Sequence, residues 1–199
     1  MYLNYENVKK HLACKLINGK RNEKLLEDVP HTRFLDLALV VYCRVDDSVI
    51  GSGTILVNNA HCKSWGVTEQ EVLGTARENM KTLLPVSFMN IRELIPADDL
   101  MAEEFPMYVL TNSESYFGAA SMIYDSVLSE IGKTLEQDYW ILPSSIHECI
   151  IIPVREDMQP GQLSELVREV NATRVAPEDY LSDSVYYYNT VLHRLTAAG

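Results

Sequence analysis

Apolar residues recur at the three- and four-residue spacing of an amphipathic helix in several stretches of the chain. One stretch follows Thr68, which forms a T-x-x-E capping box with Glu71, and continues to Pro85. Another opens at Pro160, a residue type that suits the first turn of a helix. The pattern predicts helices over residues 4–18, 22–27, 68–84 and 114–136, and a further helix from residue 160 onwards.

Apolar runs of strand length lie between these helices. The longest, residues 34–45, is apolar on both faces, which is typical of a central strand covered on each side. Shorter runs predict strands over residues 54–57, 88–94, 107–110, 139–142 and 149–154, and a terminal hairpin that turns near residues 189–190. Because paired strands alternate with single helices, we predict an α+β fold, a mainly antiparallel or mixed sheet of hairpins with helices packed on it.

The chain contains no internal repeat, low-complexity tract or linker rich in proline and glycine. We therefore predict a single α+β domain over residues 1–199, with a helical N-terminal segment over 1–30 and a main body over 31–199. No apolar stretch reaches the length of a membrane-spanning helix, and the N-terminus lacks the layout of a signal peptide. We expect a cytoplasmic protein with no membrane partner.

Charge is distributed unevenly along the sequence. The whole chain carries a net charge of −11, and residues 93–199 hold 5 Lys or Arg against 18 Asp or Glu. Since phosphate binding needs clustered basic residues, this acidic half argues against a nucleic-acid partner. We interpret it as a solvated surface that promotes solubility. The alternative is an acidic surface that binds a partner protein in a mobile element or a defence system.

Common cofactor and metal motifs are missing from the sequence, including the glycine-rich nucleotide loops and H-E-x-x-H. We expect no cofactor. The four cysteines are widely spaced, which in a cytosolic chain indicates free, mostly buried thiols. A zinc site would have to gather side chains without any recurring ligand spacing, and we expect no metal; the residues concerned are His31, His61, Cys62, His147 and Cys149.

The segment PSSIHE concentrates the candidate chemistry in Ser144, Ser145, His147 and Glu148. A serine, a histidine and a carboxylate are the parts of an acyl-transfer site, provided that the base reaches the nucleophile. If a strand begins at His147, alternation places Glu148 on the opposite face. A Ser–His pair is then left, and a triad needs an acid from elsewhere. The other interpretations are a ligand-binding site, or a turn whose serines cap backbone groups while His147 fixes the loop.

A second polar cluster, NNAHCKSW, supplies Asn59, His61 and Trp65 as candidate ligand-binding residues. The alternative is a loop that packs Trp65 as an anchor ahead of the capped helix.

Several segments share the motifs of one family. They are LLEDVPHTRFLDLALVVYC, the N-x-x-H-x-x-x-WGVT pattern from Asn58 to Thr68, ENMKTLLP, MYVLTN followed by FGAA, LPSSIHE, and VREVNAT through VAPE to LSDSVYYY. They cover most of residues 25–190, and in them the chain resembles a bacterial family catalogued as a domain of unknown function, number five-six-eight-eight. The resemblance implies that the chain corresponds to the C-terminal part of longer members. It implies no reaction.

Taken together, these features favour a non-catalytic cytoplasmic module that binds a protein or a small ligand. The first alternative is a hydrolase or transferase that uses a Ser–His pair in the PSSIHE loop. The second is the acidic partner-binding protein described above. The sequence sets no oligomeric state.

Overall fold

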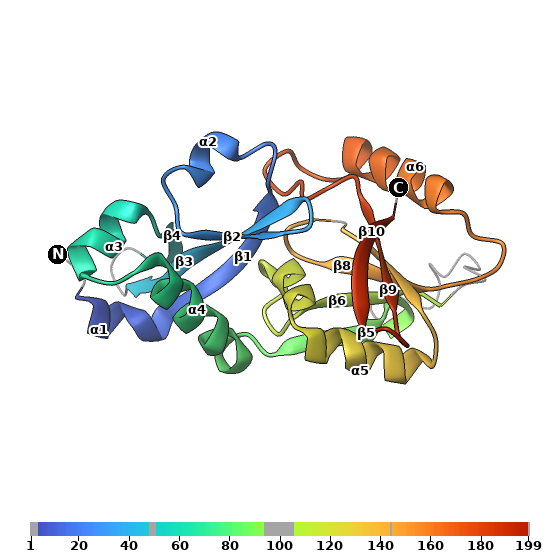
Figure 1. Cartoon of the computed structure of the whole chain (residues 1–199), viewed down its shortest axis with the longest axis horizontal. Helices are drawn as coiled ribbons and strands as arrows, with labels where there is room; N and C mark the ends of the chain where they lie inside the picture. Colours follow the sequence, from blue (N-terminus) through green and yellow to red (C-terminus); the bar gives the residue numbers. More distant parts are fainter. Residues whose placement is uncertain (1–3, 48–50, 94–105, 144, 199) are drawn as a thin grey trace. The chain divides into compact units, whose positions relative to one another are not determined.

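The computed structural model describes residues 4–47, 51–93, 106–143 and 145–198. It divides the chain into two compact units, Met1–Pro85 and Val86–Gly199, each with its own antiparallel sheet and its own helices (Figure 1). The predicted α+β class with antiparallel sheets and packed helices is confirmed. Compact units need not unfold separately, so the single domain expected over residues 1–199 stays a prediction. Among the described residues, no helix has both the length and the apolar character needed to cross a membrane.

In the first unit, the long strand β3 (Leu37–Asp47) is central. Strand β1 (Leu12–Asn18) pairs along one edge of it. Strands β2 (His31–Phe34) and β4 (Gly51–Leu56) pair with successive parts of the other edge. The prediction of a central strand is therefore confirmed for the residues of β3.

Helix α4 (Glu69–Leu83) packs against β1. Thr68 caps it as expected, since the Thr68 hydroxyl accepts the Glu71 N–H at 3.2 Å. The predicted apolar face is buried through Val72, Ala76 and Met80. The other helices of this unit are short: α1 (Tyr5–Val8), the 3-10 turn η1 (Lys9–His11), α2 (Glu23–Leu26) and α3 (Asn59–Trp65).

The predicted N-terminal helix over residues 4–18 is wrong beyond α1 and η1. Leu12 and Leu16 fit a helix face at four-residue spacing, but they equally fit one face of a strand, together with Cys14. In the structure this stretch is β1, in which every residue except the half-buried Lys15 is buried. Pairing with β3 and burial on both faces outweigh the local helical spacing. The expected helical segment over residues 1–30 is thus interrupted by a core strand.

In the second unit, six antiparallel strands lie in the order β10-β9-β7-β8-β6-β5. The terminal hairpin is confirmed as β9 and β10. The strand bounds are β5 Val86–Asn90, β6 Tyr108–Asn112, β7 Tyr139–Leu142, β8 Cys149–Pro153, β9 Val185–Asn189 and β10 Arg194–Ala198. A short 3-10 turn, η2 (Ile91–Glu93), follows β5.

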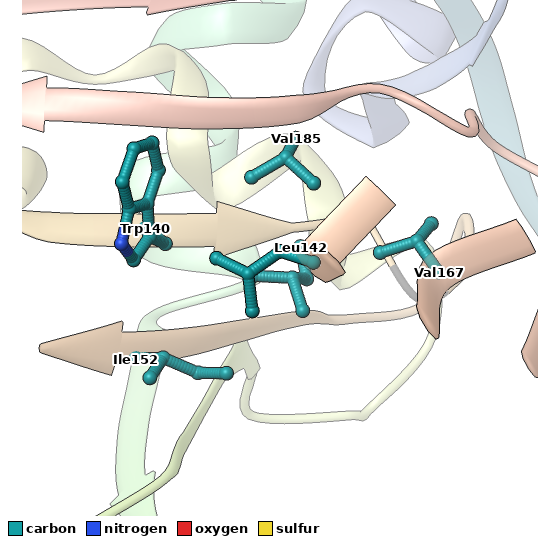
Figure 2. Close-up of a cluster of buried hydrophobic side chains, with 6 residues drawn as sticks. Trp140, Leu142, Ile152, Val167 and Val185 are labelled. Atoms are coloured by element: carbon teal, nitrogen blue, oxygen red, sulfur yellow. The ribbon is translucent and has the colours of Figure 1, made fainter. Parts of the chain in front are cut away.

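Helices cover both faces of this second sheet, as Figure 1 shows for α5 (Asp125–Leu135) and α6 (Pro160–Thr173). Leu163 and Val167 of α6 pack into a cluster with Trp140, Leu142, Ile152 and Val185 (Figure 2). On the opposite face, the Tyr139 hydroxyl donates to the carbonyl of Leu128 in α5 at 2.8 Å. Alternation along β7 therefore sends Trp140 towards α6 and Tyr139 towards α5.

The long helix predicted over residues 114–136 is wrong in its first half. The chain instead forms a loop, the 3-10 helix η4 (Gly118–Ile123) and then α5. Ser115 and Phe117 have φ of 51° and 55°, a left-handed conformation that no right-handed helix can contain. The apolar spacing persists across the break because η4 is buried too.

The turn between β9 and β10 is held by one carboxylate, Asp138. Its Oδ1 accepts the backbone N–H of Thr190 at 2.8 Å and the hydroxyl of Thr190 at 2.6 Å. Its Oδ2 accepts the Tyr187 hydroxyl and the Asn189 amide. Burial raises the pKa of Asp138, but the hydrogen bonds from Thr190 and Tyr187 outweigh it, so the pKa lies below its usual value.

Candidate functional site

A pocket of about 510 Å³ borders the turn between β7 and β8. This volume falls within the range of small-molecule sites, about 300–1,000 Å³. The loop after β6 contributes Ser115 and Tyr116 to its lining, and the turn contributes Ser145, His147 and Glu148. The end of α6 and the segment after it contribute Val170, Arg174, Val175, Ala176 and Asp179.

Hydrogen bonds within the turn hold its backbone. The Ser145 hydroxyl accepts the backbone N–H of His147 at 3.0 Å, and the Ser145 N–H donates to the Glu148 carbonyl at 3.3 Å. Ile146 joins the turn to its surroundings, because its N–H donates to the Asp179 carbonyl and its carbonyl accepts the Ala119 N–H. Ser145 is buried, with 7% of its surface exposed. The turn is therefore a closed, well-connected unit rather than a loose loop.

The imidazole of His147 is fixed through both of its nitrogens. The backbone N–H of Phe117 donates to Nδ1 at 3.1 Å, which requires Nδ1 to be unprotonated. Nε2 therefore carries the proton and donates to Asp179 Oδ1 at 3.1 Å. The ring stacks on Phe117 with 5.6 Å between centroids, and Tyr116 lies at 5.2 Å. These contacts set the tautomer and the orientation of His147.

The loop that supplies the Phe117 N–H is shaped by its first residue, Asn112. The Asn112 Oδ1 accepts the Glu114 N–H at 3.0 Å, and its Nδ2 donates to the Tyr116 carbonyl at 2.8 Å. The loop closes at Gly118, where a Cβ would lie 2.6 Å from the His147 carbonyl and 2.1 Å from Thr111 Oγ1. Only glycine fits so close an approach.

Three of the four candidate catalytic residues meet at the pocket, namely Ser145, His147 and Glu148. Ser144 lies outside the described residues. His147 and Glu148 precede β8, so strand alternation does not separate them. Asp179 is an acid from another segment, as a triad would need, and it accepts a hydrogen bond from His147 Nε2. The other ring nitrogen, Nδ1, accepts the backbone N–H of Phe117 and not a serine hydroxyl. Within the described part of the chain, the ring of His147 is bonded to these two groups and not to Ser145.

Sequence reasoning missed Tyr116, Arg174 and Asp179 as pocket residues. Asp179 is 32 residues from His147 along the chain, and Phe117 is 30 residues away. The available signal was weak: VREVNAT through VAPE, a segment shared with the family, ends just before Asp179.

Asn59, His61 and Trp65 lie in the first unit, on α3, where the sequence analysis allowed for a loop. The Asn58 side chain accepts the His61 N–H at 3.0 Å, and His61 Nδ1 accepts the Asn58 N–H at 3.1 Å. His61 thus takes the place of Glu or Gln in a capping box. Its ring also stacks on Trp65. The contacts of His61 are therefore explained by its role in capping the N-terminus of α3.

All four cysteines are buried and are not in disulfides. Burial raises the pKa of Cys14 to about 12 and also raises the pKa of Cys149, so both remain protonated near neutral pH. Neither thiol is a ready nucleophile. Within the described ranges, no three His, Cys, Asp or Glu side chains are grouped to hold a metal ion.

Over residues 1–190 the chain matches a family described as a family of unknown function, DUF5688. The match includes the pocket and the turn between β7 and β8. Separate comparisons with curated proteins and with solved structures found no match. The correspondence to the C-terminal part of longer members stays a prediction. Because the match covers nearly all of its residues, the chain belongs to the family of unknown function DUF5688.

Proposed function

We propose that the second unit is a binding module that takes a small ligand, without covalent chemistry, in the pocket beside His147. One observation carries the proposal: both nitrogens of the His147 ring are hydrogen-bonded to the protein, one of them by a backbone N–H. A general base needs an available lone pair directed at its nucleophile. The imidazole instead forms part of a fixed wall.

Preorganisation of that wall supports the proposal. Phe117 is held at φ 55°, a conformation that costs on the order of 1–3 kcal/mol for a residue other than glycine. The strained residue directs its N–H at His147, while the neighbouring Tyr116 stays 43% exposed at the pocket. A wall that is already ordered lowers the entropy cost of binding.

The proposal can be tested by NMR titration of the full chain with a library of small aromatic and aliphatic fragments. Bound fragments should shift the resonances of Tyr116, His147 and Arg174 in a saturable manner. The Tyr116→Ala variant should weaken the hits at least about tenfold, roughly 1.4 kcal/mol. Leu166→Ala removes an exposed apolar side chain of α6 outside the pocket lining and serves as the control. A library that leaves all three pocket residues unshifted would refute the proposal.

The hydrolase alternative makes the opposite prediction. If Ser145 is a nucleophile, the wild-type chain hydrolyses an activated ester such as a p-nitrophenyl ester faster than the Ser145→Ala variant does. We expect equal rates, because the Ser145 hydroxyl is buried and accepts a hydrogen bond from the His147 backbone. An activity that depends on Ser145 would replace the binding proposal with the catalytic one.

A further inference from the structure

Two opposite charges line the pocket beside His147 without pairing with each other. Arg174, which carries a guanidinium, and Glu148, which carries a carboxylate, both line this pocket. Among the residues that the structure describes, neither side chain makes an ion pair or a hydrogen bond. Asp179 adds a second carboxylate, of which only Oδ1 is bonded to His147. The pocket therefore offers both an anion-binding and a cation-binding group.

An apolar surface lies beside these charges. Tyr116 is exposed at the pocket, and Val170, Val175 and Ala176 line the side formed by the end of α6 and the residues after it. An aromatic ring and short aliphatic side chains suit an apolar or aromatic group of the ligand.

We propose that this pocket binds an α-amino acid in its zwitterionic form, with an aromatic or large apolar side chain. Arg174 binds the carboxylate, for which guanidinium geometry is well matched. Glu148, with Asp179 beside it, binds the ammonium group, and Tyr116 contacts the side chain. The inference rests on the proposed function, since it names the ligand class of the same pocket. A ligand of a single charge would leave one of the two charged groups without a partner.

Three matched probes test the proposal on the full chain by calorimetric and NMR titration in one buffer near neutral pH. L-Phenylalanine carries both charges, phenethylamine carries only the ammonium group, and 3-phenylpropanoate carries only the carboxylate. We expect L-phenylalanine to bind at least about tenfold more tightly than either analogue, and to shift Tyr116, Glu148 and Arg174. Equal affinity for either analogue, or no binding of L-phenylalanine, overturns the proposal.

Two variants assign the charged groups. In the Arg174→Gln variant, the affinity for L-phenylalanine should fall to the affinity for phenethylamine. In the Glu148→Gln variant, the affinity for L-phenylalanine should fall to the affinity for 3-phenylpropanoate. Arg168→Gln, on the exposed side of α6 and outside this pocket, is the matched control and should keep the preference for the zwitterion. A preference that survives Arg174→Gln and Glu148→Gln overturns the assignment.

The fragment library separates the existence of the binding site from the class of its ligand. If fragments bind beside Tyr116 while L-phenylalanine does not, the pocket is a binding site and only the zwitterion inference fails. If no fragment and no amino acid binds there, both fail.

Discussion

His147 is the residue that connects the loop after β6 to the turn before β8. Without its ring, the buried N–H of Phe117 loses its acceptor and Asp179 loses its donor. An unsatisfied buried donor costs about 1–3 kcal/mol. We therefore expect His147→Ala to lower the free energy of unfolding by about 2 kcal/mol in urea titrations.

His11 is an exposed histidine of the first unit and provides the control for this variant. His11→Ala should change the free energy of unfolding by less than about 0.5 kcal/mol. Equal effects of the two substitutions would show that the hydrogen bonds of His147 contribute nothing to stability.

Asp138 is expected to make stability depend on pH. Its pKa is lower in the folded chain than in the unfolded chain, so its contribution is present above the unfolded value, about 3.9, and is lost as pH falls through the folded value. Between pH 5 and pH 3, wild type should therefore lose more stability than Asp138→Asn.

Thermal unfolding across this pH range tests the effect of Asp138. Glu156→Gln, at an exposed position, should follow wild type closely. Parallel curves for wild type and Asp138→Asn would show that the carboxylate does not stabilise the β9–β10 turn through its charge.

For single residues, the sequence indicates which segment holds the candidate functional side chains, but not which groups they are hydrogen-bonded to. Ser145, His147 and Glu148 stand together in one turn, so their shared place was predictable. The partners of His147 come from a strained loop and from a segment beyond α6. No local spacing encodes such tertiary contacts.

A helix was predictable from the sequence where the spacing of its apolar residues and its N-terminal capping residue indicated the same structure. In α4 the Thr68 cap and the buried face of Val72, Ala76 and Met80 give the same answer. In β1, apolar spacing suited both a helix and a strand, and only pairing with β3 decided between them. The prediction of one long helix over residues 114–136 failed because the buried η4 continues the apolar pattern, although its backbone is not α-helical.

The loop–η4 junction can be tested at Gly118. A Cβ there would lie 2.7 Å from the Asn112 backbone nitrogen and closer still to Thr111 Oγ1, so Gly118→Ala forces the junction apart. We expect a loss of about 2 kcal/mol or more in the free energy of unfolding, together with shifts of the His147 resonances.

Gly161 offers a matched control in the first turn of α6, since a Cβ added there would have no atom within 4 Å beyond its own chain neighbours. Gly161→Ala should leave stability unchanged or raise it by up to about 1 kcal/mol, because alanine is the better helix former. If Gly118→Ala is tolerated equally well, the loop after β6 is not tightly held.

For the whole molecule, the two compact units differ in charge. Residues 86–199 hold 6 Lys or Arg and 18 Asp or Glu, a net charge of −12, whereas residues 1–85 hold 11 and 10, a net charge of +1, so the acidic excess lies entirely in the unit with the pocket. This unit also has its own six-stranded sheet and cores on both faces. We expect residues 86–199, expressed alone, to fold and to keep the dispersed NMR resonances that they have in the full chain.

A collapsed spectrum for residues 86–199 would instead support the single domain predicted over residues 1–199. Added salt should leave the NMR spectrum of a folded unit unchanged, apart from the resonances of exposed charged residues. We expect this both for the full chain and for residues 86–199 alone.

Whether the His147 ring forms part of a binding wall or acts as a base is decided by its tautomer. Nitrogen-15 NMR of the imidazole near neutral pH distinguishes the protonated from the unprotonated ring nitrogen. We expect a protonated Nε2 and an unprotonated Nδ1 that accepts the Phe117 N–H. A protonated Nδ1, with the lone pair of Nε2 available at the pocket, would refute the binding wall and restore His147 as a candidate base.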